Sequence, residues 1–253
     1  MKNKFLKVTI ALTICSIMNI ASAGIIHWAD WESETVTENA TTVSGKFVTN
    51  TSTVDIEYKN TQGIHFLQTG TGIDYFSNSD YSQSSTTLLN PNLSPYTSSV
   101  VDNIPTAAEM IALKNKGSQT LSFSESVANI VFSYVSLNDN GYSFDQDFDI
   151  LSVGSVEGNE DGYFGAGTST KEIIDHGNGN IEYRLVGAGE AHGTIQFKGS
   201  FDQLTWNSLN NETWNGFTVG IEGTTTEVPE PTTLAIFSLA MFGLITRRFN
   251  QKN

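Results

Sequence analysis

Apolar and polar residues alternate with a period of two in three well-separated segments of the chain. The segments are 54–59, 181–185 and 217–221, where Val, Ile, Tyr, Phe or Leu occupies every second position. Successive side chains of a strand point to opposite faces, so this spacing predicts strands with one buried face. Only the stretch 107–116 has an apolar spacing that favours a helical turn. We therefore expect residues 24–226 to form one all-β domain, an antiparallel β-sandwich that is jelly-roll-like.

Asn140 and Gly141 predict a tight turn in the middle of this domain. Both residue types tolerate the positive φ angles that a type I′ hairpin turn requires, and apolar residues alternate on either side of them. The turn would place Asp139 opposite Tyr142 and so fix the register of the two strands. In this register the acidic residues after the turn face away from the core.

Three carboxylates, those of Asp145, Asp147 and Asp149, would then share one strand face. Same-face residues of a strand lie about 6.7 Å apart, so Asp145 and Asp147 could bracket one calcium ion with help from other oxygen ligands. An EF-hand loop is excluded, because Ile150 and Val156 occupy the positions where it needs glycine and a bidentate glutamate. A solvated strand face without an ion is the alternative, and no other cofactor is expected.

The N-terminal residues 1–23 have the order of a secretory signal peptide. Lysines at positions 2, 4 and 7 precede an apolar stretch, and Ala21 and Ala23 form a small-residue cleavage site before Gly24. We expect the Sec translocon and signal peptidase to act on this segment. The single cysteine of the chain, Cys15, lies within it. The exported domain would therefore contain no disulfide and would depend on its core.

The C-terminal residues 227–253 form a second targeting segment. Pro229, Glu230 and Pro231 precede an apolar run over 232–246, which Arg247 and Arg248 follow. A straight helix needs about twenty apolar residues to cross the hydrocarbon layer, so this run predicts a short transmembrane helix and a transient anchor. The positive-inside rule keeps the arginines in the cytoplasm and the domain outside the inner membrane. A permanent anchor is the alternative.

The order of Pro-Glu-Pro motif, apolar run and basic end resembles the PEP-CTERM sorting signal of Gram-negative bacteria. The resemblance implies an exosortase as processing partner, anchoring in the inner membrane before processing, and a location at the cell surface or outside the cell afterwards. Segments 148–152, 195–197 and 214–220 also resemble the recurrent body of many PEP-CTERM proteins, a resemblance that implies no activity. Bacteria with this system typically make exopolysaccharide, which makes exopolysaccharide an expected partner.

The exported domain is strongly acidic. The chain has 13 Lys and Arg against 27 Asp and Glu, with a formal net charge of −14. Six of the basic residues but only two of the acidic ones lie in the two targeting segments, so the domain keeps seven basic and 25 acidic residues. A negative field of this size repels nucleic acid, and no nucleic-acid partner is expected.

The sequence contains no evident catalytic motif. None of its four histidines begins a His-Glu-x-x-His motif, and no serine lies in a Gly-x-Ser-x-Gly motif. Glu190 and His192 are close in the chain, but a loop before a strand at 194–198 accounts for them equally well. We expect a protein without catalytic activity. A polysaccharide-active enzyme that uses two carboxylates is a remaining alternative.

The segment 70–96 is the best candidate for a ligand-binding surface. It is rich in Ser, Asn and Thr and contains Tyr75, Tyr81 and Tyr96, a mixture of rigid aromatic and adaptable polar groups that suits binding loops. An insertion without a ligand is the alternative, and the four tryptophans are expected mainly in the core. The sequence thus predicts an exosortase-processed surface or extracellular-matrix protein associated with exopolysaccharide or biofilm, with a carbohydrate-binding module as the second hypothesis.

Overall fold

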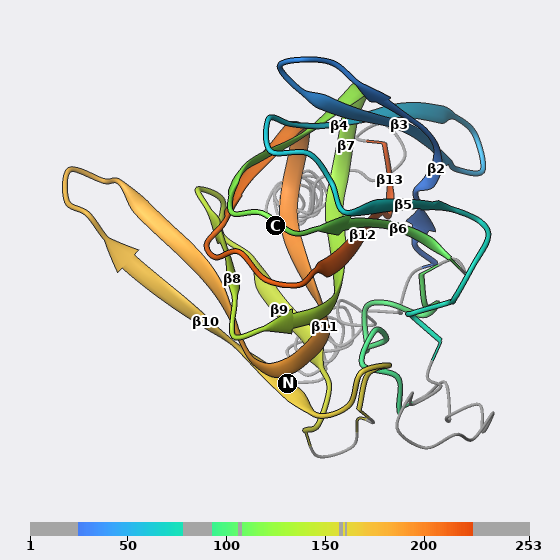
Figure 1. Ribbon diagram of the computed structural model, residues 1–253. Helices are drawn as coiled ribbons and strands as arrows, with labels where there is room; N and C mark the ends of the chain where they lie inside the picture. Colours follow the sequence, from blue (N-terminus) through green and yellow to red (C-terminus); the bar gives the residue numbers. More distant parts are fainter. Residues whose placement is uncertain (1–24, 78–92, 106–107, 157–158, 160, 225–253) are drawn as a thin grey trace, which may run out of the picture.

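The computed structural model of the chain describes residues 25–77, 93–105, 108–156, 159 and 161–224, which fold mainly into antiparallel strands of one curved sheet (Figure 1). The strands are β1 (His27–Trp28), β2 (Asp30–Val36), β3 (Thr41–Val48), β4 (Thr53–Asn60), β5 (Phe66–Thr69), β6 (Glu109–Leu113), β7 (Gly117–Asn138), β8 (Gly141–Phe144), β9 (Asp149–Val153), β10 (Gly167–Asp175), β11 (Ile181–Ser208), β12 (Asn215–Ile221) and β13 (Gly223–Thr224). The antiparallel all-β class of the domain is therefore confirmed.

Two long strands, β7 and β11, form the centre of the sheet. They have 22 and 28 residues, and they pair from Gly117 and Ser208 at one end to Asn138 and Glu190 at the other. The second edge of β7 pairs with β4, β13 and β12, whereas β11 also pairs with β8, β9 and β10. In Figure 1 the two strands run side by side through the molecule, and β10 with the start of β11 extends away as a hairpin.

Strand β7 separates a main apolar core from two smaller clusters. Ile130, Phe132 and Tyr134 belong to the main core, and Val131 and Val135 belong to the smaller clusters. This is the alternation that period two predicts, but both faces of the strand are covered. β12, which lies between β7 and β6, is likewise buried along its whole length.

Aromatic rings fill the centre of the main core. Phe132 of β7 and Phe217 of β12 stack with their ring centroids 5.1 Å apart, and Trp206 of β11 lies 5.2 Å from Phe217. Trp31 of β2 is also 1% exposed. Full burial of one large apolar side chain stabilises a fold by about 1.5–3 kcal/mol. This burial takes the place of disulfides, since the only cysteine of the chain lies at position 15.

Strand β4, which lies between β3 and β7, has the pattern predicted from the sequence. Val54, Ile56 and Tyr58 are buried, whereas Asp55 and Glu57 between them are exposed. By contrast, the helical turn predicted at 107–116 is wrong, because residues 109–113 form β6. All five residues of β6 are buried between β5 and β12. A strand that is covered on both faces has no polar positions at period two, so its pattern resembles that of a buried helix.

The predicted hairpin at Asn140 and Gly141 is also wrong. β8 does not fold back on β7 but continues along β11, where Gly141 pairs with Val186. Asp139 has a positive φ angle of 46°, whereas Asn140 and Gly141 do not have positive φ angles. Asn140 instead fixes this junction through its side chain, whose Oδ1 accepts hydrogen bonds from the backbone N–H groups of Gly141 (2.7 Å) and Asn210 (2.8 Å).

Gly141 is predicted to tolerate no side chain, because the backbone of β11 lies against it. A Cβ atom at this position would lie 2.8 Å from the carbonyl oxygen of Leu185 and 3.0 Å from Cδ1 of Leu209. We expect Gly141→Ala and Gly141→Asn each to lower the free energy of unfolding by about 1–3 kcal/mol, measured by denaturant titration. A type I′ turn would accept Asn much better than Ala. An Asn variant clearly more stable than the Ala variant would therefore contradict the close approach.

Candidate ligand-binding site

The three carboxylates expected on one strand face do not share one. β8 ends at Phe144 and β9 begins at Asp149, so Asp145 and Asp147 lie in the connection between the two strands, where both are exposed. The predicted strand face is therefore wrong, for the same reason as the hairpin. Once β8 pairs with β11 instead of β7, the chain must turn after Phe144 to reach the position of β9.

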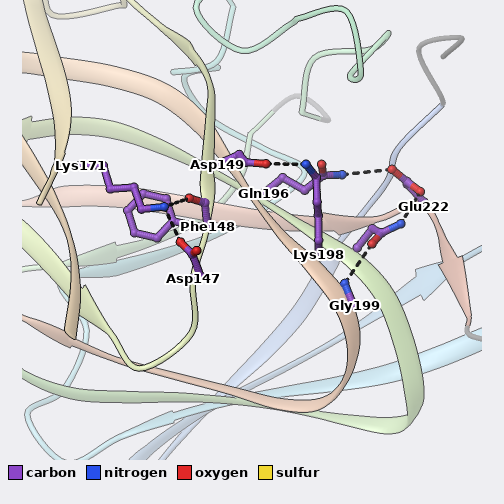
Figure 2. Close-up of polar contacts among 9 residues, drawn as sticks. Asp147, Phe148, Asp149, Lys171, Gln196, Lys198, Gly199 and Glu222 are labelled. Carbon is purple, nitrogen blue, oxygen red and sulfur yellow. Dashed lines mark hydrogen bonds and ion pairs between the residues drawn. The ribbon is translucent and has the colours of Figure 1, made fainter. Parts of the chain in front are cut away.

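Two of these carboxylates pair with lysines from different strands (Figure 2). Asp147 forms an ion pair with Lys171 of β10, whose Nζ also donates to the carbonyl oxygen of Phe148 and lies 5.0 Å from the centre of the Phe148 ring. Asp149 forms an ion pair with Lys198 of β11. Within the described ranges, no three His, Cys, Asp or Glu side chains are grouped as a metal site would need. Calcium at Asp145 and Asp147 stays a prediction without support from this geometry.

A partly buried amide network nearby contains a further acidic residue. Glu222, just after β12, accepts hydrogen bonds from Gln196 (3.0 Å) and Asn129 (2.8 Å), and Asn129 in turn accepts one from the backbone N–H of Gly199 (Figure 2). Asn129 has a φ of 52° at a point where the register of β7 and β11 shifts. The Glu222 carboxylate therefore holds this irregularity in place.

The three tyrosines of the predicted binding segment have different positions. Tyr81 lies outside the described residues. Tyr96 is fully buried, which corrects its expected place on a surface, and its hydroxyl lies 2.8 Å from Nδ1 of His192. Tyr75 is half-buried, and its ring lies 5.1 Å from that of Trp214 and 5.7 Å from that of Phe164.

His192 belongs to the core rather than to a loop. It lies within β11, is fully buried, and packs against the ring of Phe164. Burial lowers the pKa of His192 to about 3, so the ring is neutral at physiological pH. Glu190, two residues earlier in the same strand, instead accepts hydrogen bonds from Ser136 and Asn138. The expected loop before residue 194 is therefore wrong, and the two side chains face different surroundings.

A hollow of about 490 Å³ opens beside Tyr75 and Trp214, at the end of β7, and we call it the Trp214 hollow. Its volume falls in the range of small-molecule sites. Its lining residues are Ser136, Asn138, Asp139, Phe164, Glu190, Glu212, Thr213 and Trp214. They come from four separate parts of the chain, which explains why the sequence did not reveal the hollow.

One wall of the Trp214 hollow is aromatic. The rings of Trp214 and Phe164 meet edge to face, with centroids 5.2 Å apart. Phe66 of β5 lies 5.2 Å from Trp214, and Tyr75 contacts both rings of the wall. Edge-to-face contacts of this kind fix ring orientation. Tyr75 therefore contacts both rings of the wall, although it does not itself line the hollow.

Another part of the lining, the acidic wall, is held by hydrogen bonds. The Glu190 carboxylate accepts hydrogen bonds from the Ser136 hydroxyl and from Nδ2 of Asn138 (2.6 Å). Ser136 and Asp139 have φ angles of 56° and 46°, a left-handed conformation that is uncommon for residues other than glycine. The kinked end of β7 thus turns two polar side chains, those of Ser136 and Asn138, toward Glu190.

Glu212 completes the acidic side. Burial raises the pKa of its carboxyl to about 7 and the Glu190 charge adds to this rise, although the amides of Asn215 and Asn140 act in the opposite direction. Both carboxylate oxygens are shielded from solvent, and neither has a partner in hydrogen-bonding geometry. A buried carboxylate without a partner is costly when charged, which accounts for the direction of the shift.

Two further hollows are weaker candidates, the first because it has no aromatic ring and the second because its rings, Phe144 and Trp206, are each only 1% exposed. The larger, of about 550 Å³, is lined by residues 97–99, 101–104 and 159 and contains no aromatic ring. The smaller, of about 300 Å³, lies beside Glu182. That carboxylate already binds Arg184, His176 and Ser143, and the Arg184 guanidinium is the main cause that lowers its pKa to about 2. The Trp214 hollow is therefore the best candidate for a ligand.

The comparisons with known proteins concern the C-terminal segment. Residues 227–248 match the family model described as the PEP-CTERM protein-sorting motif. The chain is a PEP-CTERM protein. The PEP-CTERM signal makes it an exosortase-targeted protein, exported and anchored in the membrane before processing, and then a protein of the cell surface or extracellular space. No curated protein and no solved structure matches the chain.

The targeting segments of this PEP-CTERM protein lie outside the described residues, including the predicted cleavage site at Ala21, Ala23 and Gly24 and the predicted C-terminal membrane helix. In the ranges that the structure describes, no helix is long and apolar enough to cross a membrane. The last described strand, β13, ends at Thr224, three positions before the sorting motif begins.

The ion pair of Asp147 is predicted to be weak and the segment indifferent to calcium. The Asp147 side chain is 63% exposed, and exposed pairs contribute about 0–1 kcal/mol. We expect Asp147→Asn to lower the melting temperature by no more than about 4 °C, and CaCl₂ and NaCl at equal ionic strength to give equal melting temperatures. A rise with calcium alone that disappears in Asp147→Asn would instead establish an ion at this segment.

Glu212 is predicted to lower stability as the pH rises. Its folded-state pKa of about 7 exceeds the ordinary 4.5, so its contribution to stability is fully present below pH 4.5 and is lost between there and pH 7. We expect Glu212→Gln to raise the melting temperature at pH 8 by about 2–4 °C and to leave it nearly unchanged at pH 4.5. Burial also raises the pKa of Glu109 to about 7. Glu109 is present in the unmodified chain and in the variant, so its effect on stability cancels in the comparison. An equal effect of Glu212→Gln at both pH values would contradict the raised pKa, and exposed Glu57→Gln is the control.

Proposed function

We propose that the β-domain is a non-catalytic component of the cell surface or extracellular matrix, and that it associates with exopolysaccharide or biofilm after exosortase processing. The observation that carries the proposal is the match of residues 227–248 to the PEP-CTERM sorting motif. Bacteria that carry the PEP-CTERM sorting system typically make exopolysaccharide, and this favours a polysaccharide partner. Passage through the Sec translocon and cleavage by signal peptidase before Gly24 belong to the same proposal.

The composition of the domain supports an extracellular role. The 25 acidic residues of the domain keep its molecules apart by charge repulsion. Its core of buried aromatic rings provides stability without a disulfide. The histidine that packs on Phe164 of the candidate site, His192, is neutral, buried and in hydrogen-bonding distance of the Tyr96 hydroxyl. It is therefore a poor general acid or base for a solvent-borne substrate.

A carbohydrate-binding module is the second candidate function, and the Trp214 hollow is the observation that favours it. The hollow combines two aromatic rings with carboxylate, amide and hydroxyl groups. Sites with an apolar wall and a few placed polar groups are typical of small-ligand binding. The matrix role and the carbohydrate-binding role are compatible, because a matrix protein can bind a polysaccharide through such a site.

Sorting is predicted to depend on the Pro-Glu-Pro sequence. We expect the double variant Pro229→Ala and Glu230→Ala to accumulate as the full-length chain in the inner membrane, because the exosortase no longer acts on it. Immunoblots of inner-membrane, outer-membrane and medium fractions measure this. The matched control replaces Thr225 and Thr226 with Ala, just before the matched motif, and should be sorted normally. Normal release of the Pro229 and Glu230 variant would disprove exosortase-dependent processing.

A further inference from the structure

We propose that the Trp214 hollow binds one neutral sugar unit of a polysaccharide chain, with Trp214 as the stacking surface and Glu190 as the main hydrogen-bond acceptor. This inference rests on the proposed function, because it names the site and the class of sugar through which the domain would hold a polysaccharide. It is carried by the pairing of an aromatic wall with a fixed carboxylate in one open hollow.

The aromatic wall suits the apolar face of a pyranose ring. Trp214 and Phe164 are both half-buried, so part of each ring faces the hollow while the rest packs against Tyr75 and Phe66. The negative face of an aromatic ring attracts the weakly positive C–H groups of a sugar. Because neighbouring rings hold the wall in place, little side-chain freedom is lost when a ligand stacks on it.

The acidic wall suits the hydroxyl groups of the same sugar. The two protein donors to Glu190, from Ser136 and Asn138, leave part of its acceptor capacity unused. A carboxylate that is already oriented can accept hydrogen bonds from sugar hydroxyls without reorganisation. Thr213 and Asp139, both exposed at the rim, add a further donor and acceptor.

The charge of the hollow decides which sugars it takes. Asp139 and Glu190 line it on the acidic side, the Glu212 carboxylate is shielded from solvent, and none of the lining residues is Lys or Arg. A uronate or a sulfated sugar would bring a negative charge against these groups and would be repelled. A neutral sugar uses the acceptors without adding charge, and its C–H face uses the aromatic wall.

The experiment is a glycan array followed by calorimetry on the full chain, purified in a detergent without a sugar headgroup. The array carries neutral oligosaccharides, uronate oligomers and free-amine glucosamine oligomers. We expect binding to the neutral members and none to the uronate oligomers, whose charge the carboxylates of the hollow repel. On the best neutral member, Trp214→Ala should weaken affinity about tenfold or more, as expected for an aromatic anchor, and Glu190→Gln about threefold to tenfold.

Two control variants test the position of the site. Tyr183→Ala removes a half-buried ring of β11 that lies over Lys171, and Glu57→Gln removes an exposed carboxylate of β4. Neither residue lines the hollow, so both variants should bind as the unmodified chain does. Melting curves check that each variant is folded. If Trp214→Ala does not fold, Glu190→Gln decides, because it keeps the size of the side chain.

Each result bears on the inference. Binding of no neutral glycan, binding of charged glycans alone, or undiminished affinity in folded Trp214 and Glu190 variants would overturn it. Co-fractionation of the unmodified chain with exopolysaccharide separates this failure from that of the proposed function. If co-fractionation persists in Trp214→Ala and Glu190→Gln, the matrix role stands and the hollow is not its site. New reducing ends on a bound glycan would overturn the non-catalytic role and leave the binding site in place.

Discussion

The fold depends on the pairing of β7 with β11. Every other strand of the described sheet joins one of these two strands directly or through one or two intervening strands. The pairing also supplies internal polar contacts, such as that between the Ser133 and Thr194 hydroxyls at 2.8 Å. Where its register shifts, Asn129 and Ser136 take positive φ angles, and their side chains bond to Gly199 and Glu190. The irregularities of the central pair are thus the places where polar groups collect.

The Trp214 hollow is one of these places. β7 leaves its regular course at Ser136, and β8 resumes the pairing with β11 from Gly141 onward. Between these positions, the Asn138 side chain donates a hydrogen bond to Glu190, and the Asn140 side chain forms hydrogen bonds with the backbone of Asn210. The Glu190 carboxylate and the aromatic wall therefore meet where the sheet is interrupted. At such an irregularity, binding groups can be exposed to solvent while the core stays closed.

The sequence predicted features that one strand determines by itself. Val54, Ile56 and Tyr58 alternate with charged residues because one face of β4 is exposed, and that pattern is visible without a partner strand. Pairing between strands was not visible in this way. Asn140 and Gly141 fit a local turn, but β8 pairs instead with the edge of β11, where the partner of Gly141 is Val186, 45 positions away in the chain. The sorting motif was predictable because its order of residues is itself the signal.

The candidate site could be predicted only in fragments. Tyr75 was identified as part of a binding segment, Glu190 as a possible acid, and Trp214 as a core residue, yet the structure brings all three to one region. Nothing in the spacing of positions 75, 190 and 214 indicates that they meet. Their proximity follows from β12 pairing with β6 and from the kink of β7, which are long-range consequences of the fold.

The place of β12 in the sheet has a consequence for export. β12 is among the last strands in the chain, but it lies between β7 and β6. A chain that crosses the membrane from its N-terminus delivers this inner strand after nearly all the others. The sheet therefore cannot close until residue 221 has emerged, when only a few residues separate the domain from the sorting motif at 227–248. Completion of the sheet and emergence of the sorting motif are therefore separated by only a few residues of the chain.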